Sequence, residues 1–150
     1  MKVIFLLCAE SATVDTARNT LSVFHIIEEF NSPSFPFVVP ALYICALLEK
    51  PLDEPEPEGV EVKLQVDNRE LLVNPLQMQF GDKPRLRAIT GIGGLIIPSP
   101  GSLIVSLNQG GMQLAAWKMQ IINIGQPKIQ PELPMSPIHV DPEKASDERS

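Results

Sequence analysis

The sequence predicts an all-β protein, an antiparallel β-sandwich of about eight strands, and three features predict this fold. Apolar and polar residues alternate with a period of two in several segments, which sends successive side chains to opposite faces of a sheet. Turn signals rich in Gly, Pro, Asn and Asp separate these segments. Proline accounts for 15 of the 150 residues, which disfavours helices. Strands with one apolar face must cover it with another layer, so we expect two stacked sheets.

The first half of the chain is predicted to hold three strands. In Lys2–Ala9 and Ala41–Leu48, both the odd-numbered and the even-numbered positions are apolar, as in strands with neighbours on both sides. Between them, Glu10–Asn19 is polar and indicates a loop with room for one helical turn. Thr20–Phe30 alternates as a strand should, and Ile27 with the two glutamates after it favours a bulge or a strand end there.

Two connections flank the third strand. Asn31–Pro40 is predicted to be rigid, because its prolines cannot donate backbone hydrogen bonds. Its Phe35–Pro36 bond is a candidate for the cis form. Glu49–Gly59 is acidic and rich in proline, so we expect an excursion that cannot pack.

The next strands are Val60–Asp67, Leu71–Phe80 and Arg85–Ile92. The first alternates most cleanly and is expected to place four residues in the core and its polar residues in water. Asn68–Glu70 is the predicted turn after it, and Pro75 favours a sheet edge or a bulge. The four core residues are Val60, Val62, Leu64 and Val66.

A β-hairpin over Ile97–Ile122 is the prediction around which the others are arranged. Three apolar and three polar residues alternate on its first strand, so successive side chains should point to opposite faces of the sheet. Gly110 and Gly111 can supply the positive φ angles of a tight reversal. On the return strand, Trp117, Met119 and Ile121 alternate with Lys118 and Gln120, so one face should be buried and the other wet. The alternating residues are Leu103, Val105 and Leu107 against Ser102, Ser106 and Asn108.

The composition changes after Ile124, which divides the chain into a sandwich domain at 1–124 and a proline-rich tail at 125–150. Five prolines recur in the tail, and its last ten residues carry no large apolar side chain. We expect a disordered or polyproline-like segment. Its spaced apolar residues could dock on a partner, or the tail could be a solvated terminus.

Charge argues against two classes of partner. The formal net charge is −6, and the acids concentrate in the 49–61 region and in the tail. A chain without a basic surplus is a poor candidate for binding nucleic acid or an anionic membrane. The opening apolar run is too short for a signal peptide, and no apolar run is long enough to span a membrane, so the expected compartment is the cytoplasm. Cys8 and Cys45 lie in apolar runs, where free thiols behave as small hydrophobes.

No residue pattern indicates a catalytic site, a metal or a cofactor, and we therefore expect that the protein is not an enzyme. His25 lies mid-strand, where a structural histidine is expected, and His139 lies in the tail, so no hydrolytic triad can be assembled. No His, Cys, Asp and Glu set has metal-ligand spacing. Gly91–Gly94 lacks the following helix that a phosphate loop needs, which favours flexible backbone or a bulge near a sheet edge.

Two sets of residues are candidates for binding a partner. Pro33, Phe35, Pro36 and Phe37 form a rigid aromatic segment, which would lose little entropy on binding or could instead close the end of the sandwich. Lys83, Arg85 and Arg87 share one parity and could bind an acidic ligand, or pair across strands with acids such as Glu61 and Asp67.

Several stretches resemble a known family. The chain is similar to the bacterial domain-of-unknown-function family 6941 over about residues 1–124. The resemblance implies a small intracellular immunoglobulin-like sandwich with no assigned activity, and it carries over no functional residue. The acidic loop and the tail depart from the family's pattern. The matching stretches are Met1-Lys2-Val3-Ile4-Phe5, Phe24, Pro33-Ser34-Phe35-Pro36 and the Pro98-x-Pro-Gly turn.

These features together favour a non-catalytic interaction or scaffold module. It would bind an as yet unknown protein partner through residues 31–40, with the tail as a further contact candidate. The alternative is a small-ligand binding protein with its site between the sheets or at the rim of the sandwich. A pocket lined by Tyr43 and Trp117 would favour a ligand, whereas a solid core beside an exposed apolar patch would favour a protein partner.

Overall fold

The computed structural model describes residues 1–125 and places nine β-strands there. No helix occurs in this part of the chain, so none is long and apolar enough to cross a membrane. The all-β prediction is confirmed, with one strand more than expected. The strands are β1 (Lys2–Asp15), β2 (Thr20–Ile26), β3 (Glu29–Ser32), β4 (Phe37–Glu49), β5 (Val60–Val66), β6 (Arg69–Leu76), β7 (Arg85–Ile97), β8 (Gly101–Gln109) and β9 (Met112–Asn123). The tail predicted to be disordered lies outside the described residues from 126 onwards.

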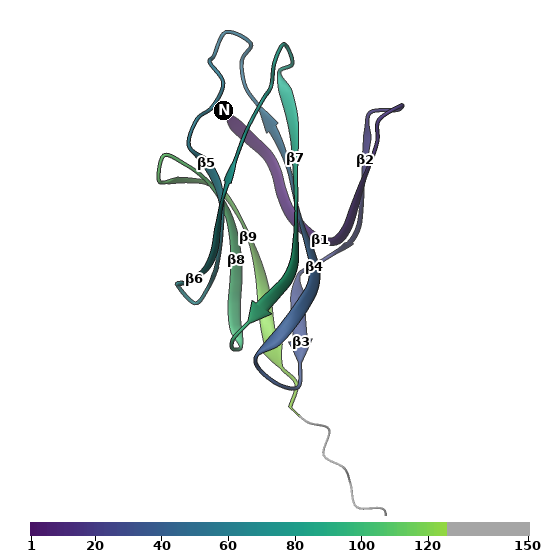
Figure 1. The fold of residues 1–150 in the computed structure, drawn as a ribbon, viewed down its shortest axis with the longest axis vertical. Helices are drawn as coiled ribbons and strands as arrows, with labels where there is room; N and C mark the ends of the chain where they lie inside the picture. Colours follow the sequence, from purple (N-terminus) through teal and green to yellow (C-terminus); the bar gives the residue numbers. More distant parts are fainter. Residues whose placement is uncertain (126–150) are drawn as a thin grey trace, which may run out of the picture.

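The strands form two sheets that pack as a sandwich (Figure 1). One sheet has four strands in the order β2-β1-β4-β7, and the other has five in the order β3-β9-β8-β5-β6. Every neighbouring pair is antiparallel except β3 and β9, which run parallel. The predicted two-layer architecture is confirmed, while its immunoglobulin-like classification stays a prediction.

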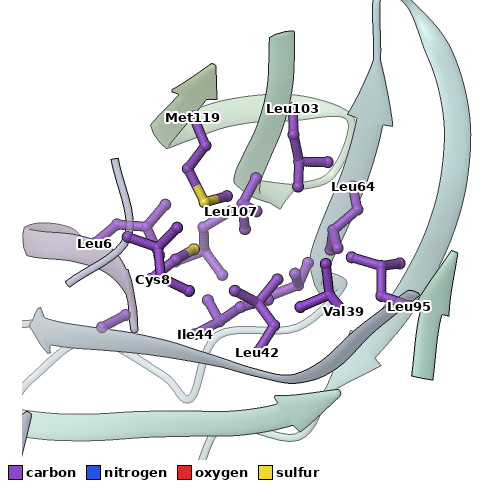
Figure 2. Close-up of a cluster of buried hydrophobic side chains, with 14 of the residues drawn as sticks. Leu6, Cys8, Val39, Leu42, Ile44, Leu64, Leu95, Leu103, Leu107 and Met119 are labelled. Carbon is purple, nitrogen blue, oxygen red and sulfur yellow. The ribbon is translucent and has the colours of Figure 1, made fainter. Parts of the chain in front are cut away.

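An apolar core lies between the sheets, and Figure 2 shows side chains from both layers meeting there. Leu42 and Ile44 come from β4 of the four-stranded sheet, while Leu64, Leu107 and Met119 come from the five-stranded sheet. All five are at most 2% exposed. Burying each of these side chains contributes roughly 1.5–3 kcal/mol, so the contact between the layers is the main source of stability.

The β8–β9 hairpin confirms the central prediction on its inner face. Leu103 is fully buried, and Gly110 and Gly111 turn the chain with φ angles of 56° and 82°. The predicted wet face of the return strand is confirmed, since Lys118 and Gln120 are exposed. On the first strand, the polar Ser106 and Asn108 are nevertheless buried, and an Nδ2 to Oγ hydrogen bond of 3.1 Å joins them. The reason is that β8 has β5 and β9 on either side, whose side chains shield small polar residues between them.

The predicted loop at Glu10–Asn19 is instead largely strand. β1 continues to Asp15 and pairs with β2 as a hairpin that leaves the body of the sandwich (Figure 1). Asp15 Oδ1 accepts hydrogen bonds from the backbone N–H groups of Ala17 and Arg18, at 2.9 and 3.1 Å, and so stabilises the turn. The second sheet does not cover this hairpin, and its polar composition therefore concealed the strand.

The rigid connection is shorter than predicted. The strand end predicted near Ile27 is confirmed, because β2 ends at Ile26 and a separate strand, β3, follows at Glu29–Ser32. Since β4 already begins at Phe37, residues 33–36 form the link. The Phe35–Pro36 peptide bond, the predicted candidate for the cis form, is cis. Pro40 lies inside β4, where it is tolerated because β1 pairs with β4 only over Tyr43–Glu49 and leaves the earlier part as an edge.

The elements between β5 and β8 follow the prediction with shifted bounds. The turn after β5 falls on Asp67 and Asn68, one residue early, and both have positive φ. β6 is an edge strand, as Pro75 predicted, although it ends before the buried Phe80. β7 is also an edge strand and runs on past Ile92, with a positive φ at Gly94 that agrees with the predicted irregularity.

The acidic segment Glu49–Gly59 was predicted not to pack, which is right for the exposed residues 51–55 and 58–59 but wrong at Lys50 and Glu56. Lys50 is only 3% exposed, and its Nζ donates a 2.7 Å hydrogen bond to the carbonyl oxygen of Glu54. The carboxylate of Glu56 accepts two 2.9 Å hydrogen bonds from the backbone N–H groups of Phe80 and Gly81. A buried cation and two backbone donors thus fix a loop whose composition alone indicates a free excursion.

Candidate binding surfaces of the four-stranded sheet

The predicted contact segment 33–37 closes one end of the sandwich. The Phe37 ring lies 5.4 Å from that of Phe35 and 6.0 Å from that of Phe30, measured between centroids. All three rings are half-buried and pack against the core. Pro33 and Pro36 are exposed. The aromatic residues therefore have a packing role, and their exposed edges lie beside the surface described next.

An apolar surface adjoins this segment on the outer face of the four-stranded sheet. Val38 of β4 and Ile96 of β7 stand opposite each other in the strand register, and each is 58% exposed. Val38 also lines a shallow hollow of about 460 Å³, together with Phe37, Pro40 and Glu10. We call Phe37, Val38, Pro40 and Ile96 the apolar surface. Val38 lies within the predicted contact segment 31–40 but was not singled out there, and Ile96 was missed, although its neighbours Leu95 and Ile97 are also apolar.

The predicted cationic residues do come together, at the other end of β7. Lys83, Arg85 and Arg87 line one hollow of about 770 Å³, which also contacts Leu47 of β4. The predicted cross-strand partners are wrong. Arg85 Nε pairs with Glu49 Oε2 at 2.7 Å, because Glu49 is its direct neighbour in the register, and Asp67 instead accepts a bond from the Ser102 backbone.

Arg87 joins two parts of the chain that the strand order separates. Its Nη2 donates to the carbonyl oxygen and to Oδ1 of Asn19, both at 2.5 Å. Asn19 lies at the tip of the β1–β2 hairpin, whereas Arg87 lies on β7, at the opposite end of the strand order from β2. The hairpin tip must therefore reach across the outer face of the sheet.

The space between the sheets offers little room for a ligand. Trp117 Nε1 donates a 2.8 Å hydrogen bond to the carbonyl oxygen of Ile27, which fixes the indole at the border of the core. Neither Trp117 nor Tyr43 lines any of the four main hollows of residues 1–125. None of these four hollows therefore has the lining expected of an interior ligand site.

The residues considered for catalysis are dispersed. The His25 side chain is 78% exposed on the hairpin, with Nδ1 2.8 Å from Glu10 Oε2, so the expectation of a histidine on a packed apolar face is wrong. Burial, with a smaller contribution from Cys45, raises the pKa of Cys8 to about 12, and burial also raises the pKa of Cys45. Both thiols are free and neutral at pH 7, in keeping with their predicted apolar role. No cluster of metal-ligating side chains occurs within residues 1–125.

Comparison with known proteins adds one finding. A family described as a family of unknown function (DUF6941) matches residues 3–122. No curated protein and no solved structure matches the chain.

Proposed function

We propose a protein-binding role for this chain, which belongs to the family of unknown function DUF6941. In this proposal it is a non-catalytic interaction module that contacts its partner through residues 31–40 and the apolar surface beside them. Residues Pro33 and Pro36 contribute the rigid, exposed part of the contact. The two cysteines are free thiols, which agrees with a reducing compartment, and we propose the cytoplasm.

One observation carries the proposal. Val38 and Ile96 face each other across adjacent strands, and more than half of each side chain is open to water. Isolated exposed apolar residues are ordinary, but these two are direct cross-strand neighbours, and Val38 lines one hollow together with Phe37 and Pro40. Covering such a patch with a partner removes apolar area from water, which favours association.

The backbone under this patch is also suited to binding. Val38 and Ile96 lie on paired β-strands, and the neighbouring Phe35 and Phe37 rings are packed together. A surface held in this way loses little conformational entropy when a partner docks. The packed interior gives no comparable support to the alternative, a small-ligand site between the sheets.

Two matched substitutions test the role. Val38→Asp places a charge in the apolar surface, and Val73→Asp places the same charge on β6, where Val73 is 37% exposed. A protein captured by the full chain from a lysate would be identified, purified and titrated against the wild type and both variants by calorimetry. We expect Val38→Asp and Ile96→Asp to weaken binding by at least about tenfold, which corresponds to ~1.4 kcal/mol.

Circular dichroism and thermal melts should first show that all variants are folded. Val73→Asp should bind like the wild type, because β6 lies in the other sheet. Unchanged binding by Val38→Asp and Ile96→Asp, or an equal loss with Val73→Asp, would refute the proposed surface.

A further inference from the structure

We propose that the hollow between the β1–β2 hairpin and β7 binds a small amphiphilic anion, in which a carboxylate or phosphate group is attached to an aliphatic chain. This site is separate from the apolar surface. It lies near the start of β7, and Ile96 follows Ile89 by seven residues of strand, or about 23 Å.

The hollow exists because the hairpin arches over the sheet. Figure 1 shows β1 bending away from β4 and the hairpin rising beside β7, on the side opposite the five-stranded sheet. The Arg87 bonds to Asn19 connect the hairpin tip to the far edge strand. The hollow is open on one side, and its volume of about 770 Å³ falls within the range of roughly 300–1,000 Å³ found for small-molecule sites.

Apart from Asn19, the polar part of the lining is cationic, and it is only partly neutralised within residues 1–125. Lys83 and Arg87 form no ion pair within residues 1–125, and Arg85 pairs with Glu49 through Nε. Only Nη2 of Arg87 is used in the bonds to Asn19. The guanidinium groups therefore keep donors that match the oxygens of a carboxylate or phosphate, and such charge-assisted bonds are stronger than neutral ones.

The rest of the lining is apolar. Val14 of the hairpin, Leu47 of β4 and Ile89 of β7 contribute aliphatic side chains to the same hollow. Leu47 and Ile89 lie on the face of the sheet that points away from the core, where no second sheet covers them. Apolar walls beside convergent cations favour a ligand that carries both an anionic group and an aliphatic chain, in preference to a bare anion.

Calorimetric titration of the full chain tests this site, with decanoate and decyl phosphate as probes below their micelle concentrations. We expect both anions to bind one to one with a Kd below about 1 mM. Decyltrimethylammonium has the same chain with the opposite charge and should not bind. Acetate and inorganic phosphate lack the chain and should bind at least about tenfold more weakly than the corresponding amphiphile.

Variants then locate the binding. The double substitution Lys83→Gln with Arg85→Gln should weaken decanoate binding by at least about tenfold. Lys118→Gln is the matched control, since Lys118 is exposed on β9 of the other sheet, and it should leave binding unchanged. Val38→Asp should also leave it unchanged, which separates this inference from the proposed protein-binding surface.

Three results would overturn the proposal. They are the absence of binding by both amphiphilic anions up to ~5 mM, equal binding of decyltrimethylammonium, and an equal loss in Lys118→Gln and the double variant. Binding of a polyglutamate peptide in place of both amphiphiles would also overturn it, because it would assign the cations to an acidic protein.

Discussion

Replacing Lys50 by Met should destabilise the protein and release the acidic loop. Lys50 is 3% exposed, and its Nζ donates to the carbonyl oxygens of Glu54 at 2.7 Å and Pro51 at 3.3 Å. The ammonium also lies 5.4 Å from the centroid of the Phe80 ring. Methionine keeps most of the aliphatic stem, so this substitution removes the charge and its hydrogen bonds with little change in packed volume.

The expected loss follows from two opposing effects. Each hydrogen bond to a charged group contributes roughly 1.5–3 kcal/mol, and the cation–π contact adds about 0.5–2 kcal/mol. Burying the ammonium costs several kcal/mol, which Lys50→Met recovers, but the carbonyl groups are then left without their donor. We expect a net loss of about 2 kcal/mol in the free energy of unfolding, and a decrease in Tm of roughly 8 °C for a chain of this size.

Urea denaturation followed by the fluorescence of Trp117, the single tryptophan, measures this loss. Lys118→Met is the control, because Lys118 is exposed, and it should stay within about 0.5 kcal/mol of the wild type. A protease that cleaves after glutamate should also cut the loop at Glu54 faster in Lys50→Met. A Lys50→Met variant as stable and as resistant as the wild type would refute the role assigned to this buried cation.

Three further predictions concern the core. Leu64→Ala should lower the free energy of unfolding by about 3 kcal/mol, because Leu64 is fully buried between the sheets. Urea denaturation would measure this loss, and a loss below about 1 kcal/mol would contradict the packing. Trp117→Phe should lower the free energy of unfolding by about 1–2 kcal/mol, since it leaves the carbonyl oxygen of Ile27 without its 2.8 Å hydrogen-bond donor. An unchanged Tm in thermal melts followed by circular dichroism would contradict this role. Burial raises the pKa of Cys8 from 9.0 to about 12, so above pH 9 the folded state keeps a proton that the unfolded chain loses. The free energy of unfolding should therefore fall as the pH rises between about 9 and 12, by up to ~4 kcal/mol. Cys8→Ala should flatten this decline, and a decline identical to that of the wild type would argue against the shifted thiol.

The sequence predicted those parts of the fold in which one sheet face is buried. Val60–Val66 and the β8–β9 hairpin alternate with a period of two because the second layer covers one side of each strand. The prediction failed where no second sheet covers one face of a strand. The β1–β2 hairpin leaves the sandwich, so no second layer imposes alternation on Glu10–Asp15, and composition alone resembled a loop.

The candidate sites depended on contacts that local sequence cannot contain. Lys83, Arg85 and Arg87 were predicted to act together, but the hollow that they line arises from Asn19, which is distant in sequence. Val38 and Ile96 become a surface only because β4 pairs with β7 and no layer covers their outer face. Strands with apolar residues on both faces, such as β4, are the sequence signal that could have indicated this surface.

Hydrogen exchange of the chain with and without its captured partner tests the central claim most directly. We expect slower exchange on binding at the backbone amides of Phe37, Val38, Val39 and Ala41 and of Leu95–Ile97, with β5 and β6 unchanged. Slower exchange confined to β5 and β6, with the amides around Val38 and Ile96 exchanging as in the free protein, would contradict it.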